Sequence, residues 1–201
     1  MRQLCMGIAG AAMVLAGGCA APEQAAVTGA SMPAAAAGAP VSAPGKADRV
    51  AEALMMAAIA ERAQDTAALA QAMLRLDQLG AIPQTDGDAA AMERWRASVP
   101  VGTSPMRGRA LGPAFRSATL RPGASTELNQ TFLGGRSAQI VLRVSRGPVP
   151  RLVVHDQAER QVCLASDDPI MCRWVPLYTQ RHRIEIVNIG PVQSEFYIVF
   201  D

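Results

Sequence analysis

Two cysteines and two histidines are the side chains of this sequence with the most capacity for chemistry. Cys163 and Cys172 lie nine positions apart in the stretch QVCLASDDPIMCRW, and the only histidines are His155 and His182. Two thiols can form a disulfide or a redox pair, and two thiolates with two imidazoles supply the four ligands of a zinc site. The compartment of the protein and the elements that carry these residues decide between these chemistries.

The N-terminus predicts export. Arg2 is followed by an apolar stretch over 4–18 and then by small residues, which is the pattern of a signal peptide over 1–18 and is too short for a retained membrane helix. Within this segment, LAGGC resembles the lipobox of bacterial lipoproteins, in which Cys19 becomes the lipidated first residue. Cleavage after Ala20 or Ala21 is the alternative. We therefore expect a periplasmic or outer-membrane-anchored protein, with secretion as the outcome if Cys19 is not modified.

Export favours a disulfide between Cys163 and Cys172. In an oxidising envelope, thiols on neighbouring strands pair, and closing a loop of about ten residues contributes roughly 2.7 kcal/mol on the chain-entropy estimate. Because strand residues alternate between faces, direct cross-strand pairing of these two cysteines requires one strand to be bulged or twisted. The zinc alternative adds His155 and His182, but the cysteine spacing is much wider than the usual gap of two to four residues.

The two aspartates between the cysteines suggest a second metal. Asp167 and Asp168 offer carboxylate oxygens, which calcium prefers, at the tip of the loop. Two adjacent carboxylates are too few for a calcium shell, so the sequence favours an ordinary solvated turn. We expect no metal and no cofactor.

Two further groups are candidates for ligand binding. Trp174 is either a stacking platform for a sugar or a core residue, and its apolar neighbours favour the core. An arginine-rich stretch follows the helical region and offers Arg107, Arg109 and Arg116 to an anionic lipid or glycan. The alternative, a solvated linker whose arginines reflect composition, is favoured. The net charge of +2 is too small to indicate nucleic-acid binding.

Catalysis has no support in the sequence. His155 and His182 are the only candidates for a neutral-pH base, and the adjacent His155 and Asp156 point to opposite faces of a strand. The chain contains no GxSxG, no HExxH on a helix and no glycine-rich phosphate loop. We therefore expect a protein that is not an enzyme.

The elements before residue 123 are predicted to be a tether, a helical hairpin and a linker. Residues 19–46 are rich in alanine and proline and predict a disordered tether. Residues 47–80 predict two helices that need another surface to bury their apolar stripes, with Asp65 as the cap of the second helix and Gly80 as its stop. The turn residues of 81–122 predict an irregular, arginine-rich linker. The apolar stripes consist of Val50, Leu54 and Ala58 in the first helix and Leu69, Met73 and Leu76 in the second.

Residues 123–201 predict an antiparallel β-sandwich. About seven short alternating segments are separated by turn residues, as in SAQIVLRVSRG and SEFYIVFD. The order FLGGRSAQIVLRV, LVVHD, VC, CRWVPLYTQRHRIEIVNIG and FYIVF resembles the bacterial pre-peptidase C-terminal domain, which implies a jelly-roll-like accessory domain without chemistry of its own. Relatives of that family carry an acidic calcium-binding strand where this chain has PRLVVHD, with Asp156 alone at its end. The fold class is thus α+β by segments, with an αα-hairpin before the sandwich.

The combined expectation is an exported, lipid-anchored bacterial envelope protein with a non-catalytic β-sandwich for binding or assembly. Its partner would be an envelope protein or an anionic envelope surface. The lipid on Cys19 would attach the protein to the membrane, and we expect no binding to nucleic acid. A secreted carbohydrate- or calcium-binding accessory module is the alternative, and a cell-envelope hydrolase is the third.

Overall fold

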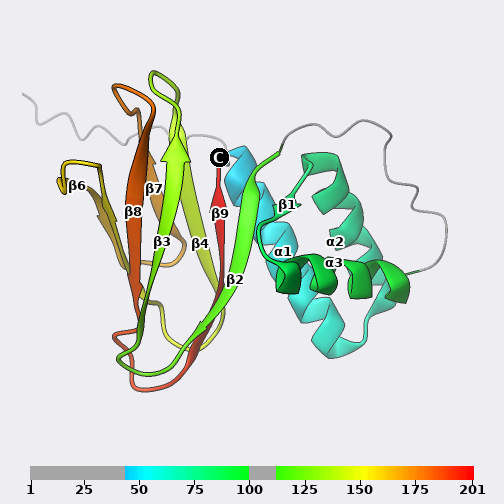
Figure 1. Ribbon diagram of the computed structural model, residues 1–201. Coiled ribbons are helices and arrows are strands. Elements are labelled where there is room, and N and C mark those ends of the chain that lie inside the picture. Colours follow the sequence, from blue (N-terminus) through cyan, green and yellow to red (C-terminus); the bar gives the residue numbers. More distant parts are fainter. Residues whose placement is uncertain (1–43, 100–111) are drawn as a thin grey trace, which may run out of the picture. The chain divides into compact units, whose positions relative to one another are not determined.

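The computed structural model describes residues 44–99 and 112–201 (Figure 1). Three helices precede the main strands: α1 (Lys46–Ala63), α2 (Thr66–Leu79) and α3 (Asp86–Ser98). The strands are β1 (Ile82–Pro83), β2 (Ala114–Leu120), β3 (Ser125–Phe132), β4 (Ala138–Arg146), β5 (Arg151–His155), β6 (Gln161–Ala165), β7 (Ile170–Trp174), β8 (Gln180–Val187) and β9 (Ser194–Phe200). The expected α+β class with a helical hairpin and a β-sandwich is confirmed. The signal peptide, Cys19 and the tether up to residue 43 lie outside the described residues.

Local chemistry sets the ends of the helices. The Asp65 side chain caps α2 by accepting a hydrogen bond from the Ala68 backbone N–H at 2.9 Å, and Gly80 ends the helix in the left-handed region, as the sequence predicts. The hairpin buries both apolar stripes, including Leu54 of α1 and Met73 of α2. The boundaries of α2 therefore follow from local capping chemistry.

The nine strands form two sheets. The five-stranded sheet has the order β1-β2-β9-β4-β7 and the four-stranded sheet has the order β3-β8-β5-β6. All neighbours are antiparallel except β1 and β2. The seven strands expected after residue 123 are all present, and their alternating residues fill the space between the sheets, as with Ile140, Leu142, Ile184 and Ile198. Two of the outermost strands, β6 and β7, belong to different sheets.

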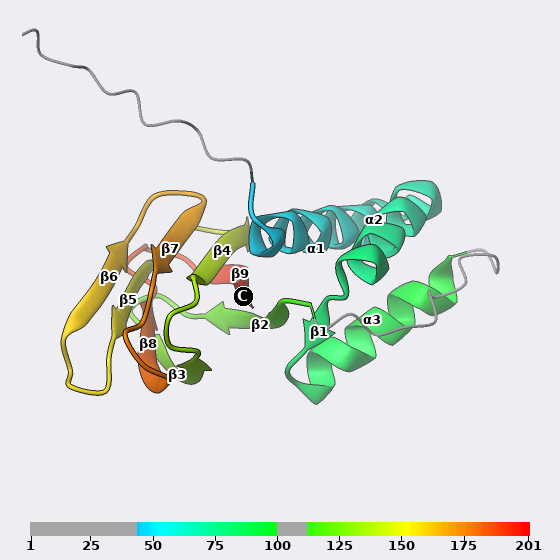
Figure 2. The same ribbon diagram turned by 90° about the horizontal axis from the view of Figure 1, so that it is seen from above.

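The helices cover the outer face of the five-stranded sheet (Figure 2). Phe115, Val141 and Val199 point from this sheet into a second apolar core shared with α1, α2 and α3. Strand β4 is buried on both faces as a result, with Ile140 toward the other sheet and Val141 toward the helices. The surface that the hairpin requires is therefore supplied by the sandwich itself.

The expectation of an irregular linker over 81–122 was wrong for its described residues, which contain β1, α3 and β2. In the stretch TDGD, Thr85 caps α3 by accepting a hydrogen bond from the Asp88 N–H at 3.1 Å, so these turn residues begin a helix. The nearly buried Asp88 carboxylate also accepts hydrogen bonds from the backbone N–H and the hydroxyl of Ser117 in β2. One carboxylate thus joins α3 to the sandwich, a contact that no local pattern shows.

Candidate functional site

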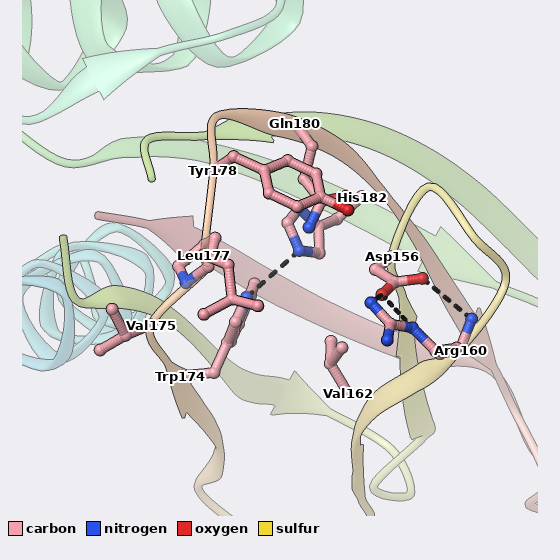
Figure 3. A pocket seen from close by; sticks show the side chains of 10 residues that line it. Asp156, Arg160, Val162, Trp174, Val175, Leu177, Tyr178, Gln180 and His182 are labelled. Atoms are coloured by element: carbon pink, nitrogen blue, oxygen red, sulfur yellow. Dashed lines mark hydrogen bonds and ion pairs between the residues drawn. The ribbon is translucent and has the colours of Figure 1, made fainter. Parts of the chain in front are cut away.

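The candidate site is a pocket of about 110 Å³ at one end of the sandwich, beside the edge strands β6 and β7 (Figure 3). The turn between β5 and β6 lines one side, and the end of β7, the β7–β8 loop and the start of β8 line the others. The lining is largely apolar and aromatic, with a few polar groups. The side chains named below are Asp156, Arg160, Val162, Trp174, Leu177, Tyr178, Gln180 and His182.

Trp174 and His182 form the inner wall of the pocket. The Trp174 indole N–H donates a hydrogen bond to His182 Nε2 at 3.2 Å. Phe132 packs edge-on against both rings, with its centroid 4.8 Å from that of Trp174 and 5.4 Å from that of His182. Trp174 is half-buried, so it is partly a core residue and partly a pocket wall.

His182 is fully buried, and burial lowers its pKa because the imidazolium form is desolvated, an effect that the Gln180 carbonyl and the charge of Asp156 partly offset. Since Nε2 accepts from Trp174, the neutral ring carries its proton on Nδ1. Nδ1 makes no hydrogen bond of good geometry within the described residues, and neither does Oε1 of the nearly buried Gln180. The pocket wall therefore contains one acceptor without a partner, Gln180 Oε1, and one donor, His182 Nδ1, whose contact with the Gln180 carbonyl falls short of good hydrogen-bond geometry.

Asp156 and Arg160 form the polar side of the pocket. The buried Asp156 carboxylate accepts hydrogen bonds from the N–H groups of Ala158 and Arg160 and from the Arg160 guanidinium, whose Nε lies at 2.8 Å. The Arg160 side chain holds the pKa of Asp156 below its usual value, against the opposing effect of burial. This carboxylate is already saturated with protein donors, so it acts as the brace of the β5–β6 turn.

The mouth of the pocket is apolar and exposed. Leu177 is 86% exposed and Tyr178 is 56% exposed, both in the loop between β7 and β8. In Figure 3 the Tyr178 ring lies over Gln180 and His182, while Leu177 stands beside Trp174. Large apolar groups at this exposure are available for contact with another molecule.

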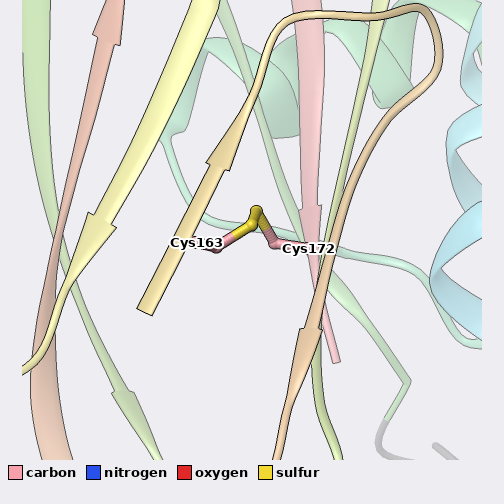
Figure 4. The surroundings of a disulfide bond; sticks show 2 residues. All are labelled: Cys163 and Cys172. Atoms are coloured by element: carbon pink, nitrogen blue, oxygen red, sulfur yellow. A yellow bond between two sulfur atoms is a disulfide. The ribbon is translucent and has the colours of Figure 1, made fainter. Parts of the chain in front are cut away.

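The disulfide between Cys163 and Cys172 is confirmed, with a Cα separation of 6.0 Å (Figure 4). Direct cross-strand pairing of the two cysteines, which the sequence left open, does not occur, because β6 is the edge of one sheet and β7 the edge of the other. The bond crosses between the sheets, so no bulge is needed to bring the two side chains together. It also occupies both sulfur atoms that the zinc alternative requires as thiolates.

The other sequence-derived metal and base candidates do not converge. His155 lies on the opposite strand face from the core residue Val154, and His182 is inside the sandwich. Asp167 and Asp168 lie in the turn between β6 and β7, at the other end of β7 from Trp174. Within residues 44–99 and 112–201, no group of three or more histidine, cysteine and carboxylate side chains is arranged to hold a metal ion.

The arginine-rich stretch is dispersed over several elements. Arg94 and Arg96 lie on α3 and pair with Glu61 at 3.9 Å and Asp77 at 2.8 Å, respectively. Arg116 is half-buried on β2. Arg107 and Arg109 lie outside the described residues, so the expected anion-binding group is not assembled by the described part of the chain.

Sequence reasoning missed most of the pocket. It singled out Trp174 and His182 but not Arg160, Leu177, Tyr178 or Gln180. A usable signal was present in WVPLY, where bulky apolar residues flank a proline between two strands, because side chains of that kind in a turn have no core to enter.

No described helix is long and apolar enough to cross a membrane.

Comparisons with known proteins find no matching family model and no matching curated protein. Among solved structures, the pre-peptidase C-terminal domain of a collagenase from Bacillus anthracis matches with 8% identity and a TM-score of 0.39, over 43% of this chain and 87% of that one. PliG from Aeromonas hydrophila, a periplasmic inhibitor of g-type lysozyme, matches with 6% identity and a TM-score of 0.36, over 44% and 84%. A de novo designed double-stranded β-helix matches with 16% identity and a TM-score of 0.30, over 43% and 97%. Similarity at this level supports no argument about function.

Proposed function

We propose that this protein is an exported component of the bacterial cell envelope, anchored through a lipid on Cys19, whose β-sandwich is a non-catalytic module for binding or assembly. The signal-type N-terminus and the LAGGC motif support export and anchoring. The disulfide between Cys163 and Cys172 fits an oxidising compartment. The binding site of this module is the pocket beside Trp174 and His182.

The observation that carries the binding proposal is the apolar pocket at the end of the sandwich, whose mouth carries the exposed side chains of Leu177 and Tyr178. Gln180, whose Oε1 accepts no hydrogen bond within the described residues, lies in the wall of the same pocket. An apolar pocket with a few convergent polar groups is the usual form of a binding site.

The same pocket supports a binding role over a catalytic one. His182 uses Nε2 to accept from Trp174, and the Asp156 carboxylate is held by Arg160 and by backbone N–H groups. No serine, threonine, cysteine or lysine lies among the residues that line the pocket. The two groups of the pocket that could act as a base, His182 Nε2 and the Asp156 carboxylate, are thus engaged in contacts within the protein.

The intact mass of the non-reduced protein, measured separately in membrane and soluble fractions of the producing cell, tests export and anchoring. We expect a membrane species that begins at Cys19, carries added acyl mass and lacks two hydrogens at Cys163 and Cys172. A soluble species that begins near Ala21 would contradict the lipid anchor, and two free thiols would contradict the oxidised envelope location.

Fluorescence of Trp174 tests the pocket. The chain has two tryptophans, and Trp95 lies in the helical core away from the pocket, so Trp95→Phe leaves Trp174 as the sole emitter. We expect at least one of three probes, namely phospholipid vesicles, peptidoglycan fragments and the periplasmic protein fraction, to change this emission. Val162→Phe fills the pocket and should abolish the change. An emission that none of the three alters would overturn the pocket as the binding site.

A carbohydrate-binding module is the second candidate, because the exposed Tyr178 and the half-buried Trp174 line one pocket. Aromatic faces are common sugar-binding surfaces on β-sandwiches, and an amide or hydroxyl group of a sugar can satisfy both a donor and an acceptor. The same titration with N-acetylated and unacetylated oligosaccharides separates this candidate from the first. Binding that depends on Tyr178 and on the sugar would replace the assembly role.

A further inference from the structure

An exposed apolar surface surrounds the mouth of the pocket. It is formed by the β3–β4 turn and the β7–β8 loop, which we call the loop end and define as residues 133–136 and 175–179. The two segments are joined by hydrogen bonds from the Gly134 N–H to Thr179 Oγ1 at 3.0 Å and from the Gly135 N–H to the Pro176 carbonyl at 2.7 Å. Four large apolar side chains of the loop end are at least half exposed: Leu133 at 52%, Val175 at 59%, Leu177 at 86% and Tyr178 at 56%.

Basic side chains lie in and beside the loop end. Arg136, Arg173 and Arg181 are exposed, and none of them forms an ion pair with an acidic group of the described chain. Two of the acidic side chains at this end are already neutralised, since Asp156 pairs with Arg160 and Glu159 with Arg183.

Asp201 is also at this end, where its backbone pairs with that of Gln139 in β4. Arg173 pairs with Gln139 from the other side of that strand, in β7. The three arginines outnumber this acidic side chain, so the local balance is positive. An apolar surface with a basic border is complementary to the interface of an anionic lipid bilayer, where apolar groups insert and arginines contact phosphates.

The chain enters the described part of the protein at the same end. Gly45 packs directly against the side chain of Gln139, the neighbour of Arg173. Figure 1 shows α1 beginning at the end of the sandwich that carries the β3–β4 and β7–β8 connections. The described chain therefore begins at the loop end.

We propose that the loop end is a membrane-contacting surface that binds anionic phospholipid directly, with Leu177 and Tyr178 in the interfacial layer and Arg136, Arg173 and Arg181 at the lipid phosphates. This inference rests on the proposed envelope function and adds that anionic phospholipid is the partner of the protein at the loop end. A protein partner would also accept an apolar patch. The exposed arginines without acidic partners favour the lipid.

Vesicle binding tests the proposal without the acyl chain. The protein starting at residue 19 with Cys19→Ser is mixed with phosphatidylcholine vesicles that contain about a quarter phosphatidylglycerol, and the bound fraction is measured by co-sedimentation. We expect binding that weakens when salt is raised and is much weaker on pure phosphatidylcholine, since surface charges are screened by ions.

Matched variants locate the surface. Leu177→Asp should weaken binding by about tenfold or more, because it removes the most exposed apolar side chain and adds a charge that anionic lipid repels. Ile59→Asp is the control, since Ile59 is 54% exposed on α1, away from the loop end, and its replacement should change binding little. Arg181→Glu should weaken binding, whereas Arg121→Glu, at the opposite end of the sandwich beyond Leu120, should not.

Three results would overturn the proposal. They are an absence of vesicle binding by the parent chain, equal binding by Leu177→Asp and the parent, or equal losses for the loop-end and control variants. Leu177 is so exposed that its replacement leaves the fold intact, which a thermal unfolding curve verifies. The intact mass of the protein from the producing cell tests export and anchoring independently of vesicle binding. A failure of vesicle binding would therefore leave the proposed function standing and would indicate that the loop end binds a protein.

Discussion

The indole of Trp174 donates its N–H to Nε2 of His182, a fully buried imidazole, at 3.2 Å. This contact sets the tautomer of His182 and ties the end of β7 to the start of β8, although the two strands belong to different sheets. Together with the disulfide between Cys163 and Cys172, it closes the sandwich beside the edges of β6 and β7.

The first prediction is that stability falls in mild acid because of His182. Burial lowers its pKa from the ordinary value of 6.5, so between the two values the unfolded chain binds more protons than the native protein. This group therefore costs no stability above about pH 6.5 and destabilises the fold progressively as the pH falls through its lower native pKa. Urea unfolding at a series of pH values should show this loss.

His182→Gln should flatten the pH dependence in this range, although it lowers stability at neutral pH. His155→Gln is the matched control, because His155 lies on the outer face of β5. An unchanged pH profile in His182→Gln would show that the acid sensitivity arises elsewhere.

The second prediction concerns the disulfide. Reduction should lower the free energy of unfolding by about 2.7 kcal/mol on the chain-entropy estimate for a loop of about ten residues. The loss arises because the bond constrains the unfolded chain and joins the edge strands of both sheets. Guanidinium unfolding with and without reductant measures it. The variant Cys163→Ser/Cys172→Ala should have the lower stability and no response to reductant, and a response would mean that the reductant acts on something else.

The third prediction concerns the ion pair between α1 and the five-stranded sheet. Arg143 Nη2 lies 2.7 Å from Asp48 Oδ1, with side chains only 28% and 13% exposed. Arg143→Met should cost about 2 kcal/mol, between the values for exposed and fully buried pairs, because it leaves the Asp48 carboxylate desolvated and unpaired. Adding Asp48→Asn should recover part of the loss.

Arg96→Met provides the comparison. Arg96 pairs with Asp77 at 2.8 Å, close to the 2.7 Å of the Arg143–Asp48 pair. The Arg96 side chain, however, is 47% exposed. Water screens this pair, so the variant should lose no more than about 1 kcal/mol. Equal losses for the two arginine variants in thermal unfolding would contradict the role of Arg143 in docking the helices.

The fourth prediction uses Tyr197 to report on helix packing. Burial against the helical core, with smaller contributions from the charges of Glu61 and Asp88, raises the pKa of Tyr197 to about 12. The chain has two tyrosines, so Tyr178→Phe leaves Tyr197 as the only phenol. Its absorbance titration should have a midpoint near pH 12. Because the native pKa is raised, this group stabilises the fold below pH 10 and loses that contribution as the pH rises toward 12. A midpoint near 10 would show that the helices do not cover Tyr197.

The sequence by itself determined the type of most elements. Alternation in SAQIVLRVSRG places Ile140 and Leu142 on one face, and the structure puts both in the core between the sheets. The capping side chain of Asp65 and the stop at Gly80 are equally local, because each acts within a few residues of backbone. The sequence also identified the cysteine pair, since the predicted export favours an oxidised bond between Cys163 and Cys172.

The tertiary structure alone decided which strands share a sheet. The residue alternation within β6 and β7 is the same whether these strands pair with each other or with strands distant in the sequence. Only the strand order of the folded protein makes the disulfide a link between the two sheets. Helix α3 and strand β2 were missed because Asp88 and Ser117, whose contact holds them together, are 29 positions apart in the chain.

The pocket has the same origin. Arg160, Trp174, Tyr178 and His182 come from two turns and two strands, and each has an ordinary structural explanation in its own sequence context. They form one site because the twist and stacking of the two sheets bring these turns and strand ends together. Local patterns encode which face of a strand is apolar, whereas the neighbours of that face depend on long-range packing, which no short stretch of sequence specifies.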